Sequence, residues 1–380
     1  MVCIYTYEEL PTGTQKEHIL QNFTGATWVS DKVSCNRVQN KFGLGCDREM
    51  EESFRCVRNI IGACGDRRNA VPIGSEFVSQ DGHKYLMKGG DLILREPVIG
   101  DFVKIDDNTM RISVEVGRKE DLKWARHLIS QRLPKGWSFH EEVVEKKIED
   151  ASNIGLLKSS MRFGGIGCLK GVLKSCFNLL GVNNNVLAGN DCFDNLRKLL
   201  VDDEGVIDSF CRMCKTQHFL ALEKWGQFDH LLFVYSKGHN VYGFARLYGQ
   251  FMFSMRLTDS YIGAAFKYGY HVDPFERHDV CCERNPSFKV SMLPRFEDQP
   301  LGVSKATFVA TRFAFLRLLK DYYNKPFHDG LSAAVDRVFD RHRGEMYVTE
   351  AMVREVVDEV MKFVHPYVVK AAENNRVKAV

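Results

Sequence analysis

The stretch CNRVQNKFGLGCD, residues 35–47, determines the fold that we predict for the N-terminal part of the chain. It leads from Cys35 into the segment Asp47 to Ile61, where apolar residues recur at spacings of four and three. That periodicity gives a helix one apolar stripe with acids opposite it. We therefore predict a helix over residues 47–61 that packs against a small domain.

Upstream of this stretch, three short motifs follow one another at short intervals: Cys3-Ile-Tyr-Thr, Lys16-Glu17-His18-Ile19 and Gly25. Together with Cys35, Asn40, Phe42-Gly43 and Asp47, their order resembles the HNH nuclease family in its ββα-metal form. In that family a Cys-x-x-Cys precedes an acid-His pair, and a second Cys-x-x-Cys is followed by Asn, a Phe-Gly and an Asp. The resemblance covers about residues 1–75.

The resemblance implies a metal-dependent endonuclease that hydrolyses DNA phosphodiester bonds. His18 would be the general base that activates water, and Glu17 would bind Mg²⁺ or Mn²⁺ with Asn40 or Gln39. Hard oxygen ligands suit Mg²⁺, which keeps several of its waters. Neighbouring residues of an extended strand point to opposite faces, so Glu17 and His18 share a site only if the backbone turns there.

The chain also departs from the family pattern. Thr6 and Val38 stand where the second cysteine of each pair is expected, and a tetrahedral zinc site needs four nitrogen or sulfur ligands. The pattern therefore disfavours structural Zn²⁺. Cys3 and Cys35 would be ligands of any residual site, with Cys46, Cys56 and Cys64 as further candidates, of which Cys56 on the predicted helix is expected to pack instead. Lys32 replaces the middle Asn of the motif. These changes favour an alternative: a catalytically degenerate HNH scaffold that acts as a nucleic-acid or protein binding module.

Basic residues near the proposed site supply the contacts expected for a phosphate backbone. Lys41 lies beside it, and Arg55 and Arg58 are three residues apart on the predicted helix, so both face one side. The implied partner is nucleic acid, with DNA favoured over RNA, and the family suggests a role in phage defence or mobile elements. A solvated face with nearby acids is the competing interpretation of these arginines. A third reading makes the motif coincidental in a structural or interaction protein.

The remaining sequence predicts an α+β protein of two domains, with 1–116 as the HNH-like domain and trailing β-hairpins, and 117–380 as a mixed substrate-selecting or regulatory domain. Strand-type runs at 231–235, 241–247 and 251–257 predict an antiparallel meander. Further helices are expected over 119–133, 158–180, 305–323, 331–339 and 349–372. A hairpin is expected over 84–95, with its turn at Gly89-Gly90.

The composition and the length of the apolar runs limit the partners and the cellular compartment that we expect. The formal net charge is +3 over 380 residues, so any basic patch must be local. Apolar runs are too short for a membrane span, and residues 2–9 (VCIYTYEE) lack the features of a secretion signal. We therefore expect a cytoplasmic protein whose cysteines are free thiols or metal ligands rather than disulfides. Cys211-x-x-Cys214 with His218, and the adjacent Cys281-Cys282, form a second metal-site candidate, against which stands a reading as helix-face thiols.

Overall fold

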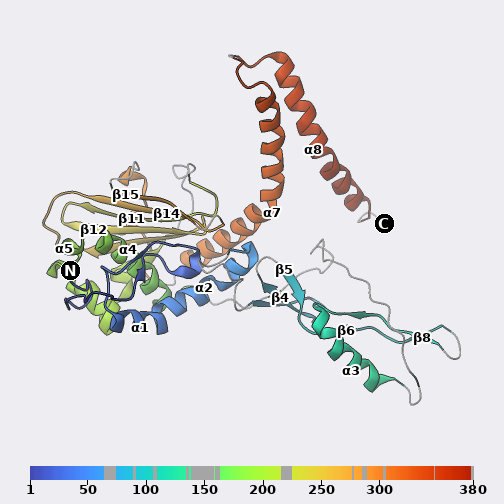
Figure 1. The fold of residues 1–380 in the computed structure, drawn as a ribbon, viewed down its shortest axis with the longest axis horizontal. Coiled ribbons are helices and arrows are strands. Elements are labelled where there is room, and N and C mark those ends of the chain that lie inside the picture. The colour runs from blue at the N-terminus through green and yellow to red at the C-terminus, as the bar shows by residue number, and fades with distance from the viewer. Residues whose placement is uncertain are drawn as a thin grey trace. The chain divides into compact units, whose positions relative to one another are not determined.

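The structure, a computed structural model, describes residues 1–63, 74–88, 91–105, 109–133, 137, 158, 163–214, 225–275, 278–284, 289–302, 305–345 and 347–377. The chain divides into two compact units, Met1–Phe315 and Leu316–Val380. Helices and antiparallel sheets occur side by side in the first unit, which confirms the α+β class (Figure 1). The predicted turn at Gly89-Gly90 lies outside the described residues.

Six antiparallel strands form the main sheet of the described chain, in the order β10-β13-β12-β11-β14-β15. Their bounds are Cys211–Met213 (β10), His230–Lys237 (β11), Asn240–Leu247 (β12), Phe251–Thr258 (β13), Lys267–Asp273 (β14) and His278–Arg284 (β15). Strands β11, β12 and β13 are the predicted meander, and their alternating aromatic and β-branched residues suit a sheet covered on both faces. The sequence patterns gave no prediction for β14 and β15.

A helix that is buried on nearly all sides covers one face of this sheet (Figure 1). It is α4, Ile166–Asn183, which contacts the sheet through β10 to β14. Helix α2, Cys46–Ile61, packs on α4, and a Cβ added at Gly171 would lie 2.9 Å from Met50 Cβ. The N-terminal segment is therefore built onto α4 and is not a separate globule.

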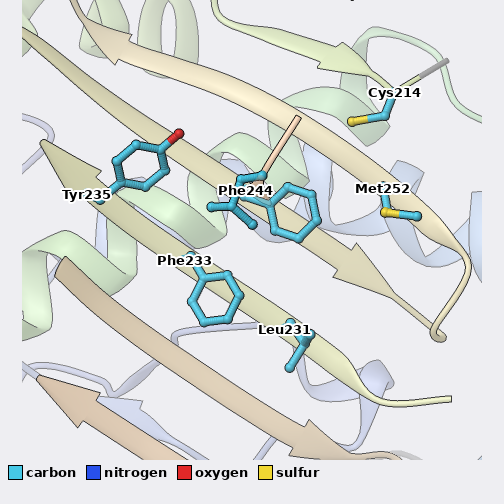
Figure 2. Packing of buried hydrophobic residues seen from close by; sticks show 7 residues of the cluster. Cys214, Leu231, Phe233, Tyr235, Phe244 and Met252 are labelled. Atoms are coloured by element: carbon cyan, nitrogen blue, oxygen red, sulfur yellow. The ribbon is translucent and has the colours of Figure 1, made fainter. Parts of the chain in front are cut away.

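The opposite face of the sheet carries a buried hydrophobic cluster. Figure 2 shows its side chains projecting from β11, β12 and β13, with Cys214 at one edge. Its buried members are Cys214, Leu231, Phe233, Tyr235, Phe244, Met252 and Leu293. Residues two apart on one strand share a face, so Leu231, Phe233 and Tyr235 all contribute to this cluster. Both faces of the sheet are thus buried.

The turn between β12 and β13 has a demanding backbone. Tyr248 has a φ of 48° and Gly249 a φ of 66°. A Cβ at Gly249 would lie 1.6 Å from the Gln227 carbonyl oxygen, so only glycine fits this close approach.

The N-terminal segment and the region after it contain shorter elements. Helix α1 spans Asn36–Leu44, and the strands of the N-terminal segment are Glu17–His18 (β1) and Val29–Ser30 (β2). A small antiparallel sheet follows, with Ser75–Val78 (β3), Lys84–Lys88 (β4) and Asp91–Leu94 (β5). Two strand pairs, an amphipathic helix and two short helices complete the unit: Val98–Ile99 (β6), Val103–Lys104 (β7), Met110–Arg111 (β8), Val114–Glu115 (β9), Leu122–Arg132 (α3), Asn185–Ala188 (α5) and Asp194–Arg197 (α6). The pairing of β4 with β5 confirms the predicted hairpin.

Two long helices make up the C-terminal part of the chain: α7, Lys305–Arg341, and α8, Glu350–Val377. Helix α7 continues through Pro326, although the sequence predicted two separate helices there. Thr349 caps α8 as predicted, because its hydroxyl oxygen accepts a hydrogen bond from Met352 N at 3.2 Å.

The division between the two units does not coincide with the predicted boundary at residue 116/117. Contacts between α2 and α4 join the two predicted domains into one unit. Among the described residues, no helix combines the length and apolar character that a bilayer crossing requires.

Candidate functional site

A ββα element lies at the centre of the N-terminal segment. Strands β1 and β2 pair antiparallel, with Glu17 opposite Ser30 and His18 opposite Val29. Helix α1 follows within a few residues. The order of two short strands and a helix is the order that the sequence resemblance leads one to expect.

The four positions of the cysteine pairs are held close together beside this element. The Cys35 N–H donates a hydrogen bond to Cys3 Sγ at 3.4 Å, and Thr6 Oγ1 lies 3.9 Å from Cys35 Sγ. Val38 is buried one turn into α1. The two turns of the motif are thus kept, but a hydroxyl and an isopropyl group replace two thiolates.

This arrangement does not fit a zinc ion. A tetrahedral zinc ion takes four nitrogen or sulfur ligands, and the hydroxyl of Thr6 and the isopropyl group of Val38 supply neither. Within the described part of the chain, moreover, no three His, Cys, Asp or Glu side chains are placed to hold a metal. Cys3 and Cys35 are both buried free cysteines.

A buried lysine lies between two carboxylates at the back of the ββα element. Lys174 Nζ, on α4, is 2.7 Å from Glu17 Oε1 and 2.6 Å from Asp47 Oδ2. The Lys174 side chain is only 1% exposed. The ammonium also lies 5.0 Å from the centroid of the Phe42 ring, within cation–π range.

The titration properties of this triad follow from its burial and its charges. Burial by itself lowers the pKa of Lys174, but Asp47 and Glu17 more than offset this and raise the pKa, so the lysine is charged. Burial raises the pKa of Glu17, and Lys174 opposes that shift. The site therefore holds one fixed positive charge facing two carboxyl groups.

Two polar side chains brace the triad: Gln21, just before a short 3-10 turn, and Ser175 on α4. Gln21 Nε2 donates to Asp47 Oδ1 at 2.9 Å and to the Gly171 carbonyl oxygen at 3.0 Å. Ser175 Oγ donates to Gln21 Oε1 at 3.0 Å. Such a network fixes the position of the Asp47 carboxylate, since a buried polar group is costly unless it is hydrogen-bonded.

The residues predicted as metal ligands have other partners or lie apart. Glu17 is paired with Lys174. Gln39 is buried, and its Nε2 donates to the carbonyl oxygens of Gln15, at 2.7 Å, and Ser34, at 3.0 Å. Asn40 is exposed on α1. These side chains do not fit Mg²⁺ or Mn²⁺, because an ammonium ion already neutralises the only carboxylate of the predicted set.

The predicted general base, His18, is half-buried in β1. Its backbone carbonyl accepts a hydrogen bond from Asn178 Nδ2 at 3.0 Å, and the Tyr5 hydroxyl donates to Asn178 Oδ1 at 2.6 Å. Glu17 and His18 are consecutive strand residues, so their side chains point to opposite faces of the strand pair. The backbone does not make the turn that a shared site requires.

The basic residues predicted to bind phosphate are held by acids. Lys41 Nζ is 3.6 Å from Asp203 Oδ2 and also donates to the Val201 carbonyl oxygen. Arg55 lies 3.8 Å from Glu52, in the pairing that the competing interpretation expects. The Arg58 side chain is buried and ion-paired with Glu51 at 3.1 Å. Its placement does not suit contact with DNA.

The second metal candidate is only partly described. Cys211 lies in β10, Cys214 follows it, and both thiols are buried, whereas His218 lies outside the described residues. Burial raises the pKa of both thiols. Cys214 belongs to the hydrophobic cluster of Figure 2, and packing accounts for its position.

Lys174 is the residue of this site that sequence reasoning missed. Its sequence signal is an ionisable side chain within the mainly apolar segment GVLKSCFNLL, residues 171–180. A fully buried lysine is rare unless it is paired, so such a residue indicates partners elsewhere in the chain. Comparison with protein-family models, curated proteins and solved structures gave no match.

Proposed function

We propose that the N-terminal segment is a degenerate HNH-type scaffold, without metal and without catalysis, in a protein that binds nucleic acid. The observation that carries the proposal is the Lys174 ammonium between Glu17 and Asp47. A divalent cation at Glu17 would lie against this charge, and Coulomb repulsion at such a distance in a buried site opposes its binding. A lysine thereby takes over the neutralisation of carboxylates that a metal performs in an active nuclease.

Support for nucleic acid as the partner comes from α3. Lys123, Trp124, Arg126 and His127 are exposed along this helix, while Ala125 and Ile129 are buried. Basic side chains contact phosphates, and an exposed tryptophan stacks on unpaired bases. The helix thus presents exposed basic and aromatic side chains together on one element.

Two measurements on the full chain test the proposal. Fluorescence anisotropy with labelled single-stranded and duplex DNA, at several salt concentrations, measures binding. We expect salt-sensitive binding that weakens at least about tenfold in Lys123→Glu with Arg126→Glu, because two phosphate contacts are replaced by repulsion. Lys237→Glu, an exposed basic position at the end of β11, is the matched control and keeps wild-type affinity. Equal affinity of all three proteins would exclude α3 as the nucleic-acid surface.

The metal-dependent endonuclease with His18 as general base is the second candidate. The specific observation in its favour is the β1-β2-α1 order with His18 at the strand pair. Plasmid incubated with Mg²⁺ or Mn²⁺ separates the two candidates. The degenerate scaffold predicts intact plasmid, whereas metal-dependent cutting that disappears in His18→Ala would overturn it in favour of the enzyme.

A further inference from the structure

Helix α8 has apolar residues on two different sides. One side packs on α7, where Met352 is buried and the Phe363 ring lies 5.6 Å from the Phe327 ring. The other side bears Val353, Val357 and Met361, which are 51%, 52% and 56% exposed. These three residues, spaced by four, form one continuous row that we call the outer stripe.

A row of charged residues runs beside the outer stripe, because each residue of the stripe is followed in the sequence by a charged residue. It consists of Glu350, Arg354, Asp358 and Lys362. All of these residues are exposed, and their signs alternate along the row: negative, positive, negative, positive. We call this set the charged row.

The charged row is complementary to itself when reversed. A twofold axis at residue 356 places Arg354 opposite Asp358 of a second copy and Glu350 opposite Lys362. Across an antiparallel helix pair, the same flank of each helix faces its copy, as in antiparallel coiled coils. In a parallel pair, the charged row of one copy would face the residues on the other side of its partner's outer stripe. The two charged rows would then not meet, and their alternating signs could not pair.

We propose that α8 is a self-association surface, on which the outer stripes of two copies of this chain pack antiparallel about an axis near residue 356. The interface is isologous, because each copy contributes the same patch. Val353 of one copy then lies near Val360 and Met361 of its partner, and the charged rows close over one edge. The ion pair between Arg354 and Glu350, 2.6 Å long and largely exposed, exchanges partners readily because exposed pairs contribute little.

A second copy fits this surface better than a lipid bilayer. Helices that lie on membranes carry mostly Lys and Arg beside the apolar face. Here acids and bases alternate in equal number, which suits pairing with the same sequence and specifies its direction. Pairing would also remove the exposed apolar side chains of the outer stripe from water, and such an exposed apolar surface is typical of an association site.

Charge reversal provides a sharp test, with the full chain studied by sedimentation velocity. We expect the wild type to dimerise at micromolar concentration. Arg354→Glu and Asp358→Arg each place like charges opposite each other and should weaken dimerisation at least about tenfold. An equal mixture of the two variants restores dimers, because each position then faces its opposite, and so does the double variant R354E/D358R. Circular dichroism checks that every variant keeps its helices.

Cysteine cross-linking tests the direction of the pair. The two copies of residue 357 are offset by roughly 3 Å along an antiparallel axis at residue 356, whereas those of residue 361 are offset by roughly 15 Å. Val357→Cys should therefore form a cross-linked dimer on mild oxidation, and Met361→Cys should not, with wild type as the control for native thiols. A monomeric wild type, single reversals that dimerise like wild type, or efficient cross-linking of Met361→Cys would each overturn the proposal.

Discussion

Replacing Lys174 by methionine tests the role assigned to the buried triad. Methionine keeps the volume of the side chain and removes its charge, which leaves two carboxyl groups at 2.7 and 2.6 Å from the former ammonium without a cation. Removing one partner of a buried ion pair costs about 3–5 kcal/mol, because the remaining charge is buried and uncompensated. We expect Lys174→Met to lower the free energy of unfolding by about that amount near neutral pH.

The loss should depend on pH in a defined direction. Burial already raises the pKa of Glu17 from its ordinary value of 4.5, and without Lys174 the pKa rises further. The folded variant therefore binds this proton more tightly than the unfolded chain does. Its stability is regained as pH falls through the raised pKa, fully so below about pH 4.5, and is lost as pH rises through it.

Guanidinium unfolding followed by circular dichroism, at about pH 7.5 and about pH 5, measures both effects. The matched control is Arg48→Met, which breaks the solvated Arg48–Glu52 pair and should change stability by less than about 0.5 kcal/mol. Adding Glu17→Gln to Lys174→Met should recover part of the loss and flatten its pH dependence. A loss below about 1 kcal/mol near neutral pH, or an equal loss at both pH values, would refute the account of the triad.

Three further outcomes are expected. Gly249→Ala places a Cβ 1.6 Å from the Gln227 carbonyl oxygen, so the free energy of unfolding should fall by more than about 2 kcal/mol. Thermal unfolding measures the change, and a variant with the Tm of the wild type would contradict the close approach. Treatment with EDTA should leave the Tm of the purified protein unchanged, because the N-terminal thiols lack two of the four ligands that zinc requires; a fall of several degrees would reveal a structural metal. Hydrogen bonds to Glu345, and then to Glu355, raise the pKa of His342. The charged imidazole should therefore stabilise the connection between α7 and α8 below about pH 6.5, and this stabilisation should be lost as pH rises through the raised pKa. Amide hydrogen exchange in the connection measures this pH dependence, which His342→Gln should abolish.

The sequence predicted those helices and strands whose pattern of apolar residues lies within a few neighbouring positions. The strands of the meander and the helix after Asp47 were predicted almost to their ends, because alternation and helical periodicity are properties of a few neighbouring residues. The continuity of α7 was missed because Pro326 argues for a break there. The rings of Phe363 and Tyr367 pack against Phe327, directly after this proline, and no local pattern reveals these contacts.

The candidate site was predictable only in part for the same reason. Glu17 and Asp47 both belong to the N-terminal motif that the sequence shows, but the lysine that pairs with them lies on a helix far along the chain. Its 127-residue separation from Asp47 leaves no trace in the spacing of the N-terminal motifs. The ion pairs of Lys41, Arg55 and Arg58 likewise depend on where acids meet them in three dimensions.

The source of the positive charge at Glu17 and Asp47 has a consequence for assembly. Because the cation is the Lys174 ammonium, every molecule carries one, and neither dilution nor exchange with the solvent can remove it. It also arrives late during synthesis, because the ribosome makes α4 well after the two acids have emerged. A fragment ending at residue 116 would therefore retain both carboxyl groups but lack the helix that neutralises them, and we expect it to remain unfolded until that helix is supplied.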